Sequence, residues 1–256
     1  MIIENISNVK PRLLKPILLS PLATIYIDHL RRKSNYEIPI LKSNQILKSE
    51  SEVYECVNIL KKSGLPLHSD IVKNWDHLIA FSQIIHTFDQ EANILDAGGE
   101  LYSPLVVWLY AYGFENLKVI NLAFKKDFSI SSINYKQGDI TSTSYPDETF
   151  DAICSLSVIE HGVDLDEFLH ECNRILKPGG VLIISTDYWN ENLQSGKIEA
   201  YGAEWMPFNS KTLNQFLNKA VSFGFDSPNV DMTTYEPVVN WKNRNFTFVI
   251  CKLELR

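Results

Sequence analysis

The sequence has few of the residues that mark several specialised classes of protein. Its four cysteines in 256 residues are widely spaced and form no CxxC pair, so neither a disulfide framework nor a zinc site is indicated. Cys154 and Cys251 lie inside apolar runs and are expected to be small buried residues. The chain starts without a basic stretch followed by an apolar core, so no signal peptide is predicted. These features favour a reducing, cytoplasmic environment.

An excess of positive charge is also missing. The net charge is −7, whereas binding along a phosphate backbone needs a basic surface, so no nucleic-acid partner is expected. No apolar run is long enough to cross a bilayer, because Lys15, Pro16 and Pro21 interrupt residues 13–27. The hydrophobic fraction of 45% is ordinary for a globular protein with a sizeable core.

The first 48 residues differ in charge from the rest of the chain. They carry eight Lys or Arg against three acidic residues, a net charge of +5, which leaves −12 for the remainder. Two interpretations stay open. The segment is either a helical extension that covers a cleft or partner with its apolar face, or a basic amphipathic patch that touches anionic lipid. The prolines break any long amphipathic helix and favour the first interpretation.

Residues 50–90 show apolar side chains at helical spacing. The pattern predicts one helix over residues 51–63 and another over residues 69–88. The histidines of this region have no ligand spacing with a matching carboxylate, so surface or capping roles and no metal site are expected for His68, His77 and His86. Residues 1–90 are thus predicted to form a helical extension or cap, followed by a domain over residues 91–256.

From residue 93 onward, strand and helix patterns alternate. Strands are predicted at residues 93–97, 118–122, 133–137, 150–156, 181–186 and 245–253, and helices at residues 104–112, 164–176 and 211–223. Continuous apolar strands that alternate with helices indicate a parallel sheet covered on both faces. Right-handed crossovers then place the strand carboxyl ends along one edge, where ligands bind.

Polar residues stand where these strands end. Asp96 closes the first strand and is followed by the tight turn Gly98-Gly99, which lets a backbone approach a ligand closely. Other polar strand ends are Asn121, Asp139, Ser155, Ser157 and Asp187. Asp and Asn oxygens accept hydrogen bonds from hydroxyl, amino or ammonium groups. The edge therefore suits a cofactor that is rich in donors.

Three blocks downstream carry a family resemblance: residues 145–153 (YPDETFDAI), 157–161 (SVIEH) and 173–182 (NRILKPGGVL). With them, residues 90–190 resemble the class I S-adenosylmethionine-dependent methyltransferases. The resemblance implies an α/β fold with a Rossmann-like, seven-stranded, mostly parallel sheet and helices on both faces, preceded here by the helical extension. It also implies S-adenosylmethionine as the cofactor.

The resemblance assigns roles along the edge. The Gly98-Gly99 turn would pass under the methionine part of the cofactor, with Asp96 near its ammonium. Asn121 would accept from the ribose hydroxyls and Asp139 from the adenine amino group. The full implied cofactor set is Asp96, Ala97, Gly98, Gly99, Asn121, Leu122, Asp139, Ile140, Ser155, Leu156 and Ser157, of which the last three would line the sulfonium side.

The chain departs from the family pattern at two places. Glu100 and Tyr102 stand where the family has its second and third glycines, and Asn121 stands where it usually has Asp or Glu. An amide oxygen is a weaker acceptor than a carboxylate. These departures keep a second interpretation open, a methyltransferase-fold subunit that binds or assembles without catalysis. A dinucleotide oxidoreductase is excluded, because Glu100 would face a pyrophosphate.

Methyl transfer to a hydroxyl needs a positioned acceptor and a general base. The candidates for the base are His161 and Asp187, against the alternative that each only completes a strand-end turn. Aromatic residues near the acceptor are predicted to contact it, with core packing as the alternative: Tyr188, Trp189, Tyr201 and Trp205. A Glu-x-x-Glu-His metal motif is incomplete, because Ser157 takes the place of the first Glu.

The sequence therefore predicts an enzyme, a methyltransferase that methylates the oxygen of a small-molecule or carbohydrate-type acceptor. The alternatives are the non-catalytic binding or assembly subunit and an enzyme that acts at a membrane surface through its basic first segment.

Overall fold

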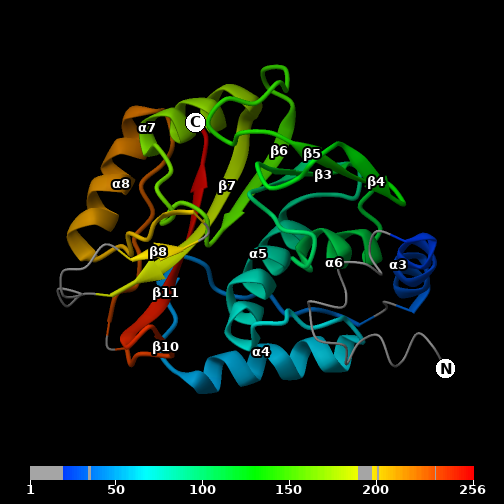
Figure 1. Ribbon diagram of the computed structural model, residues 1–256, viewed down its shortest axis with the longest axis horizontal. Helices are drawn as coiled ribbons and strands as arrows, with labels where there is room; N and C mark the ends of the chain where they lie inside the picture. The colour runs from blue at the N-terminus through cyan, green and yellow to red at the C-terminus, as the bar shows by residue number, and fades with distance from the viewer. Residues whose placement is uncertain (1–19, 34–35, 190–197, 201, 234) are drawn as a thin grey trace.

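The structure is a computed structural model that describes residues 20–33, 36–189, 198–200, 202–233 and 235–256. A single large sheet runs through the centre of the molecule (Figure 1). Its strands lie in the order β1-β11-β7-β6-β2-β3-β5-β4, and β10 also pairs with β11. Their bounds are β1 Gln45–Ile46, β2 Ile94–Ala97, β3 Leu117–Asn121, β4 Phe128–Ile130, β5 Ile133–Gln137, β6 Phe150–Leu156, β7 Leu176–Tyr188, β10 Val239–Trp241 and β11 Arg244–Glu254.

The central strands are parallel, and the outer ones are antiparallel. Pairs β2–β3, β2–β6, β3–β5 and β6–β7 are parallel, whereas β11 pairs antiparallel with β7 and β4 with β5. From β2 the chain first builds outward through β3 and β5, and then returns to β6 on the other side of β2. The topological switch point, where such sheets bind ligands, lies between β2 and β6.

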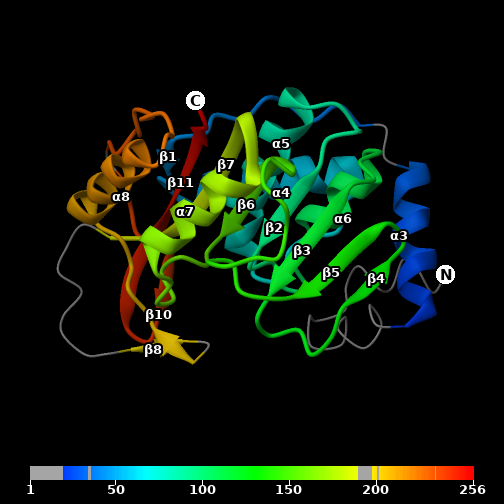
Figure 2. The same cartoon turned by 90° about the horizontal axis from the view of Figure 1, so that it is seen from above.

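Helices cover both faces of the sheet, as Figure 2 shows. One face packs against α3 (Pro21–Lys33), α4 (Glu50–Ser63), α5 (Asn74–Thr87) and α6 (Leu105–Ala111), and the other against α7 (Leu165–Ile175) and α8 (Ser210–Ser222). Successive strand residues alternate between two cores, so Ile94 joins the first and Leu95 the second. The predicted mostly parallel sheet between helical layers is confirmed.

The predicted elements of the α/β region lie close to the observed ones. The helix over 164–176 is α7, which begins at the Asp164 cap, whose carboxylate accepts from the amides of Asp166 and Glu167. β7 is longer than predicted, since Leu176 already pairs with Phe150 of β6, and a register shift follows before Val181 pairs with Ala152. The sheet has nine strands in the described chain instead of seven, because the short β1 and β10 add to β11. The short hairpin β8 (Glu199–Ala200) and β9 (Ala203–Glu204) stands apart from it.

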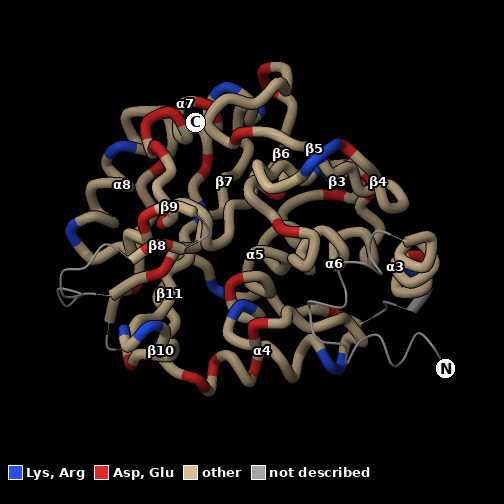
Figure 3. Tube along the Cα trace, viewed as in Figure 1, with Lys and Arg blue, Asp and Glu red and all other residues tan. Residues whose placement is uncertain are grey.

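The described part of residues 20–90 shares its core with the sheet. Trp75, Leu78 and Phe81 of α5 are buried in the same cluster as Ile94 and Leu117. A 3-10 turn, η1 (Ile71–Lys73), leads directly into α5. None of the described helices has the length and apolarity needed to span a membrane. Basic and acidic residues are scattered over the described trace (Figure 3).

Candidate functional site

The strand carboxyl ends at the switch point bring most of the predicted residues to one edge of the sheet. Asp96 lies at the end of β2, Asn121 at the end of β3 and Ser157 just after β6. Asp187 lies near the end of β7, the strand beyond β6. We call this set of strand ends and the loops that follow them the carboxyl edge.

The glycine turn after β2 fits tightly against its neighbours. Gly98 has a φ of +90°, and a Cβ built on it would lie 2.6 Å from a methyl of Val158. A Cβ on Gly99 would lie 2.3 Å from the Asp96 carboxylate. Both positions therefore require glycine, the first for its conformation as well as for space.

Asn121 holds this turn in place. Its Nδ2 donates to the carbonyl oxygens of Gly98 (2.7 Å) and Gly99 (3.2 Å), and its Oδ1 accepts from the Ala123 amide at 2.8 Å. The two carbonyls and the amide fix the orientation of the side-chain amide. A carboxylate could not donate to the carbonyls. Asn121, in place of the acidic residue that is usual in the family it resembles, therefore clamps the glycine turn by two hydrogen bonds.

An apolar side chain follows β3 and a carboxylate follows β5, and both lie at the surface. Leu122 is 67% exposed directly after Asn121. Asp139 is exposed, and its Oδ1 accepts from the amide (2.9 Å) and hydroxyl (2.7 Å) of Thr141, while its other oxygen is not used by these contacts. Ile140 is buried beside it. An exposed leucine and a carboxylate oxygen suit a flat ring that carries a donor.

Asp96 is buried beneath the turn. Ser103 Oγ donates to its Oδ2 at 3.3 Å, and burial raises the pKa of Asp96 to about 6. The same Ser103 hydroxyl lies 3.3 Å from His77 Nε2. Asp96 is thus connected through Ser103 to α5.

The loop after β6 carries the predicted serines. Ser155 is fully buried, and its Oγ has no hydrogen-bond partner in the part of the chain that the structure describes. Leu156 follows half-buried. Ser157 adopts a φ of +54°, and its amide donates to the Ser185 carbonyl at 2.9 Å.

Asp187 and Glu160 form a buried acidic pair beside this loop. Asp187 Oδ2 accepts from Trp205 Nε1 at 2.7 Å, and burial, with the nearby Glu160, raises the pKa of Asp187 to about 7. Glu160 accepts from the Thr186 hydroxyl (3.2 Å) and the Asp187 amide (3.3 Å), and burial raises its pKa as well. The next residue, His161, is half-buried, and burial lowers its pKa.

The predicted aromatic residues take different places. Trp205 is buried against Asp187. Tyr188 points to the other core, where its ring meets Tyr235 edge-on and its hydroxyl lies 3.8 Å from the sulfur of Met232. Trp189 is half-buried against the same Tyr235 ring. Tyr201 lies outside the described residues.

The first turn of α5 contributes a polar cluster that sequence reasoning did not assign to the site. Asp76 is fully buried, and its carboxylate accepts from His77 Nδ1 (2.8 Å) and Ser185 Oγ (2.7 Å). His77 and His68 are both buried, so the expectation of a surface position is wrong for these two, whereas His68 Nδ1 does accept from the Asp70 amide at 3.0 Å just before η1. The run Lys73-Asn74-Trp75-Asp76-His77, dense in polar groups at the start of an otherwise apolar helix, was the available signal.

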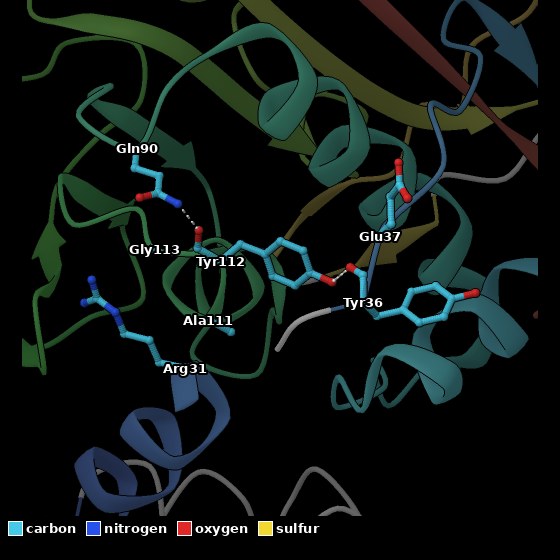
Figure 4. A pocket seen from close by; sticks show the side chains of 7 residues that line it. All are labelled: Arg31, Tyr36, Glu37, Gln90, Ala111, Tyr112 and Gly113. Carbon is cyan, nitrogen blue, oxygen red and sulfur yellow. Dashed lines mark hydrogen bonds between the residues drawn. The ribbon is translucent and has the colours of Figure 1, made fainter. Parts of the chain in front are cut away.

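A large open hollow lies away from this edge. It measures about 450 Å³ and is lined by Arg31, Tyr36, Glu37, Gln90, Ala111, Tyr112 and Gly113 (Figure 4). Gln90 and Gly113 precede β2 and β3, so the hollow lies at the amino ends of these strands. No group of three His, Cys, Asp or Glu in the described chain is arranged to hold a metal ion.

Comparison with known proteins shows a similarity over part of the chain. Residues 107–184 match the family described as Methyltransferase domain. A ubiquinone biosynthesis O-methyltransferase of Bradyrhizobium sp. (strain ORS 278) is 34% identical over 90 residues, which cover 34% of each chain. The mitochondrial ubiquinone biosynthesis O-methyltransferase of Dictyostelium discoideum is 34% identical over 115 residues, 42% of this chain and 35% of its own.

Solved structures share the fold. An S-adenosylmethionine dependent methyltransferase from Mesorhizobium loti has a TM-score of 0.51 at 16% identity, covering 71% of this chain and 97% of its own. Geranyl diphosphate C-methyltransferase from Streptomyces coelicolor A3(2) has a TM-score of 0.51 at 12% identity, covering 93% of this chain and 100% of its own. The matched regions span only about a third of the curated relatives' length. With the sheet order and the glycine turn, the chain has the fold of solved S-adenosylmethionine-dependent methyltransferases, and residues 107–184 are similar in sequence to a methyltransferase domain.

Proposed function

We propose that this protein transfers a methyl group from S-adenosylmethionine to an oxygen atom of a small-molecule acceptor. The observation that carries the proposal is the clamped glycine turn at the switch point, bordered by a buried acid at the end of β7. The names of the Bradyrhizobium and Dictyostelium relatives specify O-methyltransferases and support oxygen as the methylated atom.

The residues of the carboxyl edge fit this cofactor. Gly98 and Gly99 offer a backbone without side chains, exposed Leu122 and neighbouring Ile140 offer apolar contact, and Asp139 keeps a carboxylate oxygen for a donor. The buried Ser155 hydroxyl lacks a partner in the described chain. We assign cofactor binding to the full predicted set, from Asp96, Ala97, Gly98 and Gly99 through Asn121, Leu122, Asp139 and Ile140 to Ser155, Leu156 and Ser157.

The protein's own part in the reaction is to orient the acceptor and accept its proton. When bound, S-adenosylmethionine supplies an electrophilic methyl group. Asp187 is our candidate for the general base, because a carboxyl whose pKa is raised to about 7 is half ionised near neutral pH and can take a hydroxyl proton. His161, which follows Glu160 at the same edge, is the second candidate. Trp205, Tyr188, Trp189 and Tyr201 remain our candidates for contact with the acceptor, including a carbohydrate-type one.

Calorimetry with S-adenosylmethionine and its demethylated product tests the proposal first. We expect saturable binding of both, followed by methylated product in a screen of hydroxyl compounds read by mass spectrometry. Absence of binding at millimolar cofactor would refute the proposal.

A non-catalytic binding or assembly subunit is the second candidate. Glu100 and Tyr102 in the glycine loop favour it, and so does the engagement of the Asn121 amide with the turn, which leaves its oxygen as the only acceptor for a ribose. Cofactor-dependent methylation of any compound in the same screen would exclude this candidate.

The remaining assignments follow from composition and burial. We propose a cytoplasmic location, which the four unpaired, buried cysteines support. We propose no nucleic-acid partner, given the net charge of −7. We retain residues 1–90 as the extension and 91–256 as the methyltransferase domain, with a covering role for the extension preferred to contact with a membrane surface.

A further inference from the structure

Lys73 has no role in the function proposed above, and its surroundings differ from those of a surface lysine. It ends η1, and its side chain is only 14% exposed. Its Nζ donates a hydrogen bond to Ser157 Oγ and lies 3.5 Å from the centroid of the Phe248 ring. The residue thus reaches from the amino-terminal half of the chain to the loop after β6, at the switch point.

Two carboxylates face the Lys73 ammonium from different elements. Asp76 Oδ2 lies 3.8 Å from Nζ, and Asp187 Oδ1 lies 3.9 Å from it. The Asp76 oxygens already accept from His77 and Ser185, so this carboxylate balances the lysine charge from the core. Among the described residues, Asp187 Oδ2 accepts from Trp205 Nε1 and Oδ1 faces the lysine.

The distance between Lys73 Nζ and Asp187 Oδ1 matches that of two groups bridged by one oxygen atom. At 3.9 Å the two groups are too far apart for a direct hydrogen bond, which spans about 2.7–3.2 Å. An oxygen placed about 2.8 Å from each would accept from Nζ and donate to Oδ1. A hydroxyl satisfies both contacts. An ammonium would be repelled by the lysine, and a carboxylate has no proton for Asp187.

We propose that Lys73 and Asp187 together form the binding site for the acceptor hydroxyl, and that the acceptor is an acidic hydroxyl compound, a phenol or an enol. This inference rests on the proposed function. The hydroxyl proton passes to Asp187 Oδ1, which becomes a neutral carboxylic acid, and the oxygen keeps both electrons of the broken O–H bond as an oxyanion held by the Lys73 ammonium.

The charges around the pair favour an acidic hydroxyl over an aliphatic alcohol. The Lys73 ammonium, 3.9 Å from Asp187 Oδ1, stabilises an oxyanion, and phenols and enols form one far more readily than sugars do. Burial and Glu160 raise the pKa of Asp187 to about 7, which agrees with this class of acceptor. Glu160 is bonded to Thr186 and to the Asp187 amide, so it does not compete for the lysine. His161 is the other titratable group beside Asp187.

A chromophoric phenol gives a direct readout that does not depend on catalysis. The protein saturated with S-adenosylhomocysteine is titrated with 4-nitrophenol at neutral pH, at which Asp187 is about half ionised and the free phenol is only partly ionised. We expect the absorption of the bound phenolate to appear. The variant Lys73→Met should weaken this binding on the order of tenfold or more, whereas Lys73→Arg, which retains the charge, should keep most of it.

Lys219→Met is the matched control, because Lys219 pairs with Asp166 on the far helical layer. It should bind the phenol as the unmodified protein does. Calorimetry with S-adenosylhomocysteine and circular dichroism on each variant show whether the cofactor site and the fold are intact. We expect Lys73→Met to change cofactor affinity by less than about threefold, the size of one hydrogen bond, because the lysine reaches the proposed cofactor residues through its bond to the Ser157 hydroxyl.

The other possible results refute either the proposed function or the hydroxyl site. Failure of the unmodified protein to bind S-adenosylhomocysteine refutes the proposed function, and the titration is then repeated without it to test the hydroxyl site alone. Absence of the phenolate absorption, or equal binding by Lys73→Met and Lys219→Met, overturns the hydroxyl site. Equal weakening of phenol and cofactor by Lys73→Met also overturns it, since the lysine would then pair with the cofactor's own carboxylate.

Discussion

At the scale of single residues, Asn121 is the position where the chain differs most informatively from the family that it resembles. Its amide donates to two carbonyls of the glycine turn, at 2.7 and 3.2 Å. A change to Asp, which resembles the common family residue, would place a negative charge against both carbonyls and leave them without their donor. We expect Asn121→Asp to lower the free energy of unfolding by about 1–3 kcal/mol and to weaken cofactor binding.

Urea unfolding and calorimetry check this expectation. The control is Asn218→Asp, the same change at an exposed position on α8, which should leave both quantities unchanged. Tighter cofactor binding by Asn121→Asp would show that acceptance from the ribose outweighs the clamp.

Asp187 should make stability depend on pH. Its pKa is about 7 in the folded protein and 3.8 when exposed. Between these values the unfolded state ionises while the folded state keeps its proton, so rising pH favours unfolding, and above about pH 7 the penalty is constant. Relative to the unmodified protein, the free energy of unfolding of Asp187→Asn should therefore rise by about 2–3 kcal/mol from pH 5 to pH 8. Urea unfolding of both proteins at the two pH values measures it, and a pH-independent difference would contradict the burial argument.

At the scale of elements, the turn between β2 and α6 tolerates no side chain at Gly99. A Cβ there would lie 2.3 Å from the buried Asp96 carboxylate. We expect Gly99→Ala to displace Asp96 and reduce cofactor affinity by about tenfold or more. Gly179→Ala is the control, because a Cβ at that turn meets nothing within 4 Å. It should lose some stability through its φ of +76° and keep the affinity.

The first turn of α5 is held by Asp76. This fully buried carboxylate accepts from His77 and Ser185 and faces Lys73, and these charges lower its pKa. Removing it leaves a buried lysine without its compensating charge. We expect Asp76→Ala to cost about 3–5 kcal/mol in thermal or urea unfolding, whereas Asp70→Ala, at an exposed position just before η1, should cost little. A small effect of Asp76→Ala would show that solvent reaches this cluster.

The same helix shows why sequence patterns predicted the strands but not the buried polar residues of α5. The strands that end in Asp96 and Asn121 are short apolar runs bounded by turn residues, and their bounds were predictable within a residue or two. α5 is buried nearly all round, with Asn74, Asp76, His77 and Ser82 among its buried residues. Periodicity separates a buried face from an exposed one, so it could not identify polar residues inside the core.

At the scale of the whole molecule, the extension and the sheet are mutually dependent. The helices α3 to α6 fill one face of the sheet together, and Trp75 and Phe81 of α5 are nearly or fully inaccessible. A fragment of residues 91–256 would expose that apolar face to water. We expect the fragment to lack cooperative unfolding and to aggregate, as measured by circular dichroism and size-exclusion chromatography. A stable monomeric fragment would instead establish residues 91–256 as an autonomous domain.

The candidate site was predictable only in part. Strand ends share an edge in a parallel sheet, so the polar residues after β2, β3, β5, β6 and β7 could be grouped from the sequence. Lys73 could not, because it is 84 residues from Ser157 and meets it only through the packing of α5 against β6. The role of Asn121 as a donor to the turn likewise depends on a backbone path that no residue type reveals.

The position of Lys73 also bears on how acceptor choice could change. The match to the methyltransferase domain model begins at residue 107, well after η1, so the segment proposed to hold the acceptor oxygen lies outside the matched residues. Proteins that match the same model could then bind different compounds through differences in one short stretch near residues 70–77. Exchanging that stretch between such proteins would test the proposed acceptor site, and comparison of residues 107–184 alone would not reveal the difference.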